Sequence, residues 1–128
     1  MFKIAVVLGI VLGASLGALL RWWLSVKFNS FHDNLSLGTL LANVIACFFM
    51  GLFLGYEAGE SMVHNVVRVA FMTGFLGSLS TFSTFIGETH GHLMIKDWFK
   101  LLLGFNLQIG MGLLTFHYAK LLGHYWQG

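Results

Sequence analysis

Charged residues are scarce in this 128-residue chain: Asp, Glu, Lys and Arg together make up 9% of it, whereas hydrophobic residues make up 57%. A soluble globular domain is about one-quarter charged, so this composition argues against a soluble single domain and, equally, against intrinsic disorder. The net charge of +2, without a basic cluster, gives no indication of a nucleic-acid partner. We therefore expect a membrane protein that works in a lipid bilayer and binds no nucleic acid.

Proline is absent and cysteine occurs once, at Cys47. Without proline, any break in a helix must come from glycine or polar residues. A single cysteine excludes an intrachain disulfide and a cysteine-based metal site.

Long uncharged runs make up most of the sequence. Four stretches contain no Asp, Glu, Lys or Arg: residues 4–20, 34–56, 69–87 and 101–119. Each is close to the roughly 20 residues that a helix needs to cross a ~30 Å hydrocarbon core. Because lipid cannot satisfy backbone polar groups, each stretch should be helical. We predict an all-α membrane protein with four transmembrane helices in a single domain, residues 1–128.

The first stretch has an alternative interpretation as a signal peptide, since Lys3 precedes an apolar run with small residues near its end. The run is longer than the ~7–15 residues of a typical signal-peptide core. It also ends in Arg21-Trp22-Trp23, and paired tryptophans beside a cation are typical of an anchor at the membrane interface. A transmembrane helix is therefore favoured.

The predicted loops, near residues 29–33, 57–64 and 90–97, are short. Because the number of spans is four, both termini lie on the same side of the membrane. Lys and Arg number three on that side and four on the other. The positive-inside rule orients a protein by such a bias, and here almost none exists. This predicts a dual-topology protein that pairs as an antiparallel homodimer; a weakly oriented protein fixed by one dominant charge is the alternative.

Glycines recur every four residues in two places, the first span and the end of the second. Small residues at this spacing let helix backbones approach closely. We therefore predict tight helix packing at Gly9, Gly13, Gly17, Gly51, Gly55 and Gly59.

Polar residues enter the second span at Thr39, Asn43 and Cys47, which are spaced by four. Asn43 lies in the middle of the span, where an amide must find partners or line a wet cavity. Two interpretations stay open for Asn43: an interhelical hydrogen bond that helps packing, and a donor that faces a pore.

The third span is unusually rich in hydroxyl groups, since five of the seven residues from Ser78 to Thr84 carry one. Gly74 and Gly77 precede them. This composition predicts a helix broken in the middle of the membrane. The exposed carbonyls of such a break suit a small cation, and the N-terminus of the following half suits an anion. A continuous helix rich in Ser and Thr is the alternative.

Phe82 and Phe85 are three residues apart and share a face of that second half. The positive edges of their rings would suit an anion in a dry constriction, although two such residues are ordinarily packing residues. Glu88 follows at the end of the span, either as an interface residue or at a pore mouth.

Three motifs resemble those of the Fluc/CrcB fluoride channels: residues 17–22 (GALLRW), 38–43 (GTLLAN) and 74–85 (GFLGSLSTFSTF). They lie in the same order in the first three spans, and the length and four-span layout also fit. The resemblance implies a non-enzymatic, fluoride-selective ion channel that exports cytoplasmic fluoride passively across a bacterial inner membrane. It also implies a dual-topology homodimer with two antiparallel pores.

The resemblance assigns roles to individual residues. Phe82 and Phe85 would contribute ring-edge fluoride sites, with Asn43 beside them as a donor. The resemblance places Thr39, Ser83 and Glu88 along the same route. It places Arg21 at the pore vestibule or at the helix packing interface.

A central structural sodium ion is also implied, held at the dimer interface by the backbone carbonyls of Gly77 and Ser80. The family often has Thr where this chain has Ser80, which should matter little because the carbonyl is the ligand. One departure is clear: the family's fourth span carries hydroxyl residues spaced by four, whereas this chain has Gln108 and Gly112. Either the polar track is altered or an amide replaces a hydroxyl as donor.

The main alternative is a small multidrug-type exporter, also a four-span antiparallel dimer. Such a transporter needs a carboxylate in its first span, and the first acidic residue here is Asp33, beyond that span.

Two further alternatives rest on side-chain chemistry. Glu88, His90 and His92 form a Glu-x-His-x-His cluster that would suit zinc in a metal-binding or sensor protein. A hydrolase would need a hydroxyl such as Ser80 within hydrogen-bonding reach of His117, but these residues lie at different depths in their spans.

Overall fold

The computed structural model describes residues 4–29, 36–56 and 62–127 and, within them, the chain is helical and contains no strand. The prediction of an all-α protein is thereby confirmed. In chain order the elements are α1 (Ile4–Phe28), α2 (Leu37–Gly55), α3 (Met62–Val69), the π-helix η1 (Ala70–Leu76), α4 (Gly77–Leu79), α5 (Phe82–Met94) and α6 (Trp98–Gln127).

Four helical segments are long and apolar enough to cross a membrane: Ile4–Phe28, Leu37–Gly55, Asn65–Met94 and Trp98–Trp126. They coincide with the four uncharged stretches, so the predicted spans are confirmed. Three of them extend beyond the uncharged stretches, because Lys, Arg and Trp at a helix end can keep their polar atoms in water while their apolar parts contact lipid. Lys3 and Asp33, and most of the first two predicted loops, lie outside the described residues.

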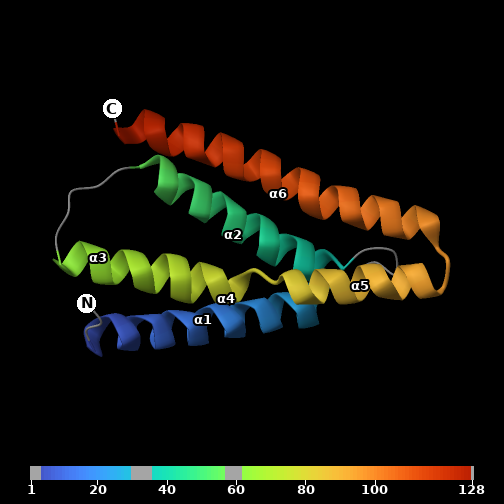
Figure 1. Cartoon of the computed structure of the whole chain (residues 1–128), viewed down its shortest axis with the longest axis horizontal. Helices are drawn as coiled ribbons and strands as arrows, with labels where there is room; N and C mark the ends of the chain where they lie inside the picture. Colours follow the sequence, from blue (N-terminus) through green and yellow to red (C-terminus); the bar gives the residue numbers. More distant parts are fainter. Residues whose placement is uncertain (1–3, 30–35, 57–61, 128) are drawn as a thin grey trace.

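The helices pair in two layers (Figure 1). α1 packs along η1 and α4, and α2 packs along α6, while α5 contacts the first part of α6. The described chain begins and ends at the same end of the molecule, as four crossings require. The third span, built from α3, η1, α4 and α5, lies between α1 and the α2–α6 pair.

Close backbone contacts occur where the glycine spacing predicts them. A methyl group on Gly17 would collide with the carbonyl oxygen of Phe75, and one on Gly51 would collide with that of Phe116. Gly9 and Gly13 face the same π-helix as Gly17, and Gly55 faces α6. The predicted packing is confirmed at these positions, and Gly59 lies outside the described residues.

The third span is interrupted at Ser80 and Thr81, between α4 and α5. Both residues are extended, with φ/ψ of −75°/151° at Ser80 and −148°/114° at Thr81. The hydroxyl-rich segment therefore breaks the helix, as its composition predicts, and it does not continue as a regular Ser/Thr-rich helix. π-Helical turns such as η1, just before the break, are found frequently at functional sites.

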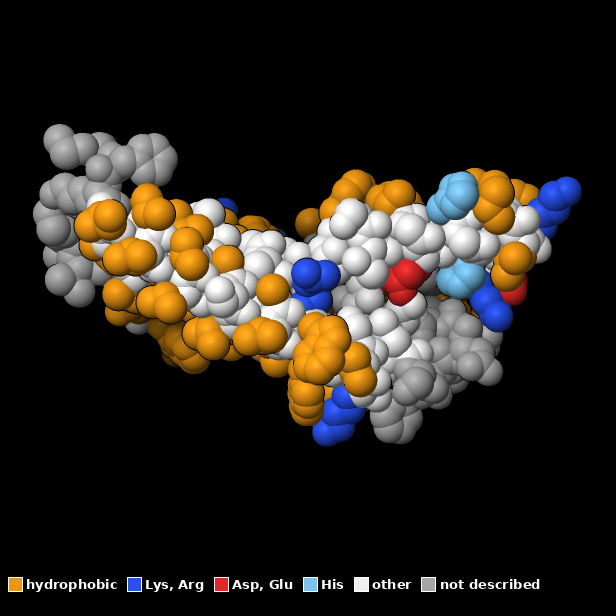
Figure 2. Space-filling model, turned by 90° about the horizontal axis from the view of Figure 1, so that it is seen from below, with side chains coloured by type: hydrophobic (Ala, Val, Ile, Leu, Met, Phe, Trp, Pro, Cys, Tyr) orange, Lys and Arg blue, Asp and Glu red, His pale blue; other side chains and the backbone are white. Residues whose placement is uncertain are grey.

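Large hydrophobic side chains cover much of the outside of the chain. On the face shown in Figure 2 they gather over α1, whereas charged and histidine side chains gather toward the opposite end. Even Phe82, beside the break, is 72% exposed. Such a surface fits contact with lipid or with a second copy rather than with water. The buried core is small and is centred on Leu76, Leu79 and Ala42.

Candidate functional site

The Asn43 side chain on α2 forms hydrogen bonds to the backbone at the interruption of the third span. Its Oδ1 accepts a hydrogen bond from the backbone N–H of Thr81 at 2.7 Å, and its Nδ2 donates to the Thr81 carbonyl at 3.3 Å. Nδ2 also donates to Oε1 of Gln108 on α6, at 2.9 Å. One amide therefore ties together α2, the break and α6, as the interhelical-bond interpretation of Asn43 predicts.

Thr81 begins the second half of the span. Its Oγ1 accepts from the backbone N–H of Thr84 at 3.2 Å, which satisfies one of the free amides at the start of α5. The same oxygen lies 3.1 Å from the Thr84 hydroxyl. The positive end of the α5 dipole thus points toward the break, where a negative charge is stabilised.

Two carbonyls at the break lose their usual helical donors. In a continuous helix the Gly77 carbonyl would accept from Thr81 N–H, which instead donates to Asn43. The Ser80 carbonyl would accept from Thr84 N–H, which instead donates to Thr81 Oγ1. Carbonyl oxygens are hard ligands that suit a small cation, so these two residues fit the sodium ligands that the resemblance implies.

Arg21 on α1 also contacts the broken span. Its Nε donates to the carbonyl of Ser78 at 3.0 Å, and the Ser78 hydroxyl donates to the Phe75 carbonyl. Arg21 therefore connects α1 to α4 just before the interruption, and its expected place at the pore vestibule or the packing interface stays a prediction.

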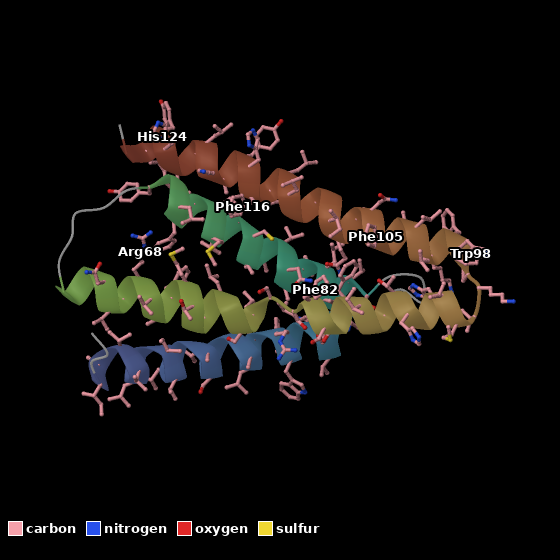
Figure 3. All side chains as sticks on the ribbon, viewed as in Figure 1. Arg68, Phe82, Trp98, Phe105, Phe116 and His124 are labelled. Atoms are coloured by element: carbon pink, nitrogen blue, oxygen red, sulfur yellow. The ribbon has the colours of Figure 1, made fainter. Side chains whose placement is uncertain are left out.

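A cavity of about 220 Å³, the break cavity, lies against the interruption. Its lining includes Asn43, Thr81, Phe82, Phe85 and Gln108. The rings of Phe82 and Phe85 have centroids 6.1 Å apart at an interplanar angle of 62°. Phe82 lies at the start of α5, next to the interruption (Figure 3). Aromatic rings of the third span and amide groups of the second and fourth spans thus surround one space.

A second cavity, of about 30 Å³, lies further along α5 and is here called the small cavity. Glu88 and His92 line it from one face of α5, and Gln108 lines it from α6. Its volume is enough for one water molecule or a similarly small ion. Phe85 and Gln108 line both cavities.

Thr39 is fully buried, and its Oγ1 has no hydrogen-bond partner among the described residues. The carboxyl group of Glu88 on α5 is the acceptor that lies close to this hydroxyl. A buried polar atom without a partner is uncommon in proteins and calls for a functional explanation.

The structure thus brings Asn43, Phe82 and Phe85 together around the break cavity, and it places Glu88 at the small cavity. Thr39 lies one helical turn from Asn43 on α2, and Ser83 is exposed on α5; neither lines the break cavity or the small cavity.

Gln108 is the site residue that sequence reasoning left without a role. Its signal was an amide in a mostly apolar span, but its partner, Asn43, is 65 residues away in sequence.

The chemical alternatives find little support. Among the described residues, no group of three His, Cys, Asp or Glu side chains is placed to hold a metal ion. His90 is exposed, away from the cavity that Glu88 and His92 line. The Ser80 hydroxyl donates to the Leu76 carbonyl, so no Ser80–His117 pair is seen.

Four spanning helices, one of them interrupted beside a cavity with polar and aromatic lining, define a multi-pass membrane protein. The sequence also matches the family described as CrcB-like protein, Camphor Resistance (CrcB), over residues 8–120. The chain belongs to this family, as its three motifs indicated.

Three relatives carry the name "Fluoride-specific ion channel FluC". The protein from Pasteurella multocida is 41% identical over 118 residues, which cover 90% of each chain. The protein from Acinetobacter baumannii (strain AYE) is 35% identical over 119 residues, which cover 93% of each chain. The protein from Pseudomonas aeruginosa is 45% identical over 82 residues, which cover 64% of this chain and 65% of the relative.

Proposed function

We propose that this protein is a fluoride-selective ion channel that exports cytoplasmic fluoride passively and relieves fluoride toxicity. Its family and the printed name of its relatives support this proposal. The observation that carries it is the break cavity, which is lined by two phenylalanine rings and two side-chain amides beside a helix N-terminus, without a basic side chain in the lining. Such groups favour an anion without binding it so tightly that it cannot leave.

The physiological direction follows from acid chemistry. Hydrogen fluoride is a weak acid that crosses membranes in its neutral form and ionises in a less acidic cytoplasm. The trapped anion is small and strongly hydrated, so a pore must replace its water with close donors. A passive pathway then lets fluoride leave down its electrochemical gradient.

The proposed route runs past Phe82, Phe85 and Asn43 and continues along α5. Ser83 would contact the anion on the exposed side of α5, Glu88 would contact it at the small cavity, and Thr39 would lie beside Glu88. The free Thr39 hydroxyl supports a place on this route, because it is a buried donor without a protein partner.

We further propose an antiparallel homodimer of dual topology, in a bacterial inner membrane, with the break at mid-membrane. Phe82 lines the break cavity and is 72% exposed, so a second copy would complete the wall of the pore. The nearly equal numbers of Lys and Arg on the two sides of the membrane support insertion in both orientations. Paired C-terminal reporter fusions test this: activity of reporters on both sides supports dual topology, and activity on one side only refutes it.

A structural sodium ion would then be held by the Gly77 and Ser80 carbonyls of both copies. The N–H groups that would bond these carbonyls in a continuous helix donate instead to the Asn43 and Thr81 side chains, which supports this proposal. Replacing sodium with N-methylglucamine should lower the melting temperature of the dimer, whereas an unchanged melting temperature would count against the ion.

Fluoride release from liposomes tests the function. Purified protein is reconstituted, and fluoride and chloride release are followed in parallel with ion-selective electrodes. Fast fluoride release without chloride release supports a selective channel. A folded dimer that releases neither ion would refute it, and drug-transport assays would then examine the exporter alternative.

A further inference from the structure

We propose that the small cavity is a binding site for a transition-metal ion such as Zn²⁺, held by Glu88 and His92, and that the bound ion obstructs the route of the anion. The metal site stands on the geometry of α5, whereas the obstruction rests on the proposed function of the chain as a fluoride channel. The site is not the Glu-x-His-x-His cluster that the sequence suggested, because His90 is exposed and does not line the cavity.

The first step is the placement of two metal-binding side chains. Glu88 and His92 are four residues apart on α5, a spacing that puts two side chains on the same face of a helix. Both line the small cavity, and carboxylate oxygen and imidazole nitrogen are ordinary ligands of zinc. Two histidines at the same helical spacing hold the zinc ion of metalloproteases. With two ligands from the protein, water fills the remaining coordination positions of the ion.

The second step is that both side chains are available to an ion. Among the described residues, none forms an ion pair with Glu88, and none forms a hydrogen bond or ion pair with the His92 ring. The fully buried hydroxyl of Thr39 lies close to the Glu88 carboxyl group. It can hold one carboxylate oxygen while the other binds the ion, and metal-binding side chains usually have such a supporting hydrogen bond.

The third step is the chemistry of the cavity. Its volume of about 30 Å³ has room for one small ion but not for a full hydration shell. The lining contains one carboxyl group and no Lys or Arg, so its charge favours a cation. An imidazole ligand suits Zn²⁺, Co²⁺ or Ni²⁺, whereas Mg²⁺ and Ca²⁺ prefer oxygen ligands alone. His92 lies two residues before the end of the Asn65–Met94 span, so an ion can reach it from water.

A metal ion at this position would interfere with the passage of an anion. Phe85 and Gln108 line both the small cavity and the break cavity, so the two cavities are neighbours. An anion on the proposed route passes Glu88, where the bound metal ion occupies the space. The double positive charge would also retain a fluoride ion that reaches it, and conduction requires that an ion can leave its site.

Isothermal titration calorimetry of the purified protein, with any affinity tag removed, tests the metal site. Zn²⁺ is titrated into the unsubstituted protein, into His92→Ala and into the matched control His90→Ala, which removes an exposed imidazole from the same helix. His92→Ala is expected to lower the zinc affinity at least about tenfold, and His90→Ala to leave it within about twofold. Equal zinc affinities of His92→Ala and the unsubstituted protein would overturn the inference. If His92→Ala does not fold, Glu88→Gln takes its place with the same expected loss and the same refuting result.

Fluoride efflux from liposomes tests the obstruction. Zn²⁺ is present on both sides of the membrane, because the small cavities of an antiparallel dimer face opposite sides, and each protein is compared with its own rate without metal. Zn²⁺ should slow efflux through the unsubstituted protein and His90→Ala, Mg²⁺ should not, and His92→Ala should need at least about tenfold more Zn²⁺ for the same effect.

Two failures of this experiment are distinguishable. Tight zinc binding that leaves the efflux rate unchanged would overturn the obstruction. If the unsubstituted protein releases no fluoride even without metal, the proposed function itself fails, and the calorimetry still decides whether Glu88 and His92 bind the metal ion.

Discussion

The contact between α1 and the π-helical part of the third span allows a paired test of the packing. In Gly17→Ala the new methyl group meets the Phe75 carbonyl and the Ser78 hydroxyl, with the Phe75 carbonyl carbon at 3.1 Å. Gly91 lies in α5, and a methyl group there has nothing within 4 Å. Gly91→Ala is therefore the matched control for the same chemical change in an exposed helix.

The expected difference follows from these surroundings. Replacing Gly by Ala inside a helix stabilises it by about 0.5–1 kcal/mol, and this gain applies to both variants. Only Gly17→Ala also forces backbone atoms apart, and overpacking of this kind costs about 1–3 kcal/mol. The helix gain cancels in the comparison, so Gly17→Ala should be less stable than Gly91→Ala by about 1–3 kcal/mol.

Unfolding by sodium dodecyl sulfate in mixed micelles, followed by tryptophan fluorescence, measures this difference. Gly91→Ala should unfold at or above the wild-type midpoint, and Gly17→Ala clearly below it. Equal midpoints for the two variants would refute the close approach of α1 to η1 and α4, and with it the role of the glycine spacing.

Three other substitutions examine the site. Phe85→Ile should keep the dimer, as judged by gel filtration, but lower fluoride efflux at least tenfold, because an aliphatic side chain has no positive edge; full efflux would argue against the ring-edge role. Asn43→Asp should abolish efflux, because a carboxylate repels the anion and cannot donate to Thr81 and Gln108; unchanged efflux would leave Asn43 as a packing residue. Thr81→Val should lower the free energy of unfolding by about 1 kcal/mol through loss of the α5 cap, and an unshifted midpoint would exclude that contribution.

Much of the fold could be predicted from local patterns in the sequence. The uncharged stretches indicated the four spans, because the length of a membrane helix and the cost of charge in lipid are both strong constraints. The hydroxyl-rich residues after Gly77 indicated the break, and the glycine spacing on α1 indicated its packing face.

The details of the site could not be predicted in the same way. The Asn43–Gln108 bond joins residues 65 positions apart, and the Arg21–Ser78 bond joins residues 57 positions apart. Which partners meet depends on how α1, α2, α4 and α6 are placed in space, which no local spacing encodes. The π-helix before the break, Ala70–Leu76, was not indicated by any local pattern either.

Fluoride efflux with and without valinomycin tests the central claim, passive and selective conduction of an anion, most directly. In liposomes loaded with potassium fluoride, a channel moves net charge, so release should remain slow until valinomycin lets potassium follow. Fast release should then begin, while liposomes loaded with potassium chloride show none. Fast fluoride release before valinomycin is added would contradict a conducting channel and indicate exchange or proton-coupled transport, and chloride release at a similar rate would contradict selectivity.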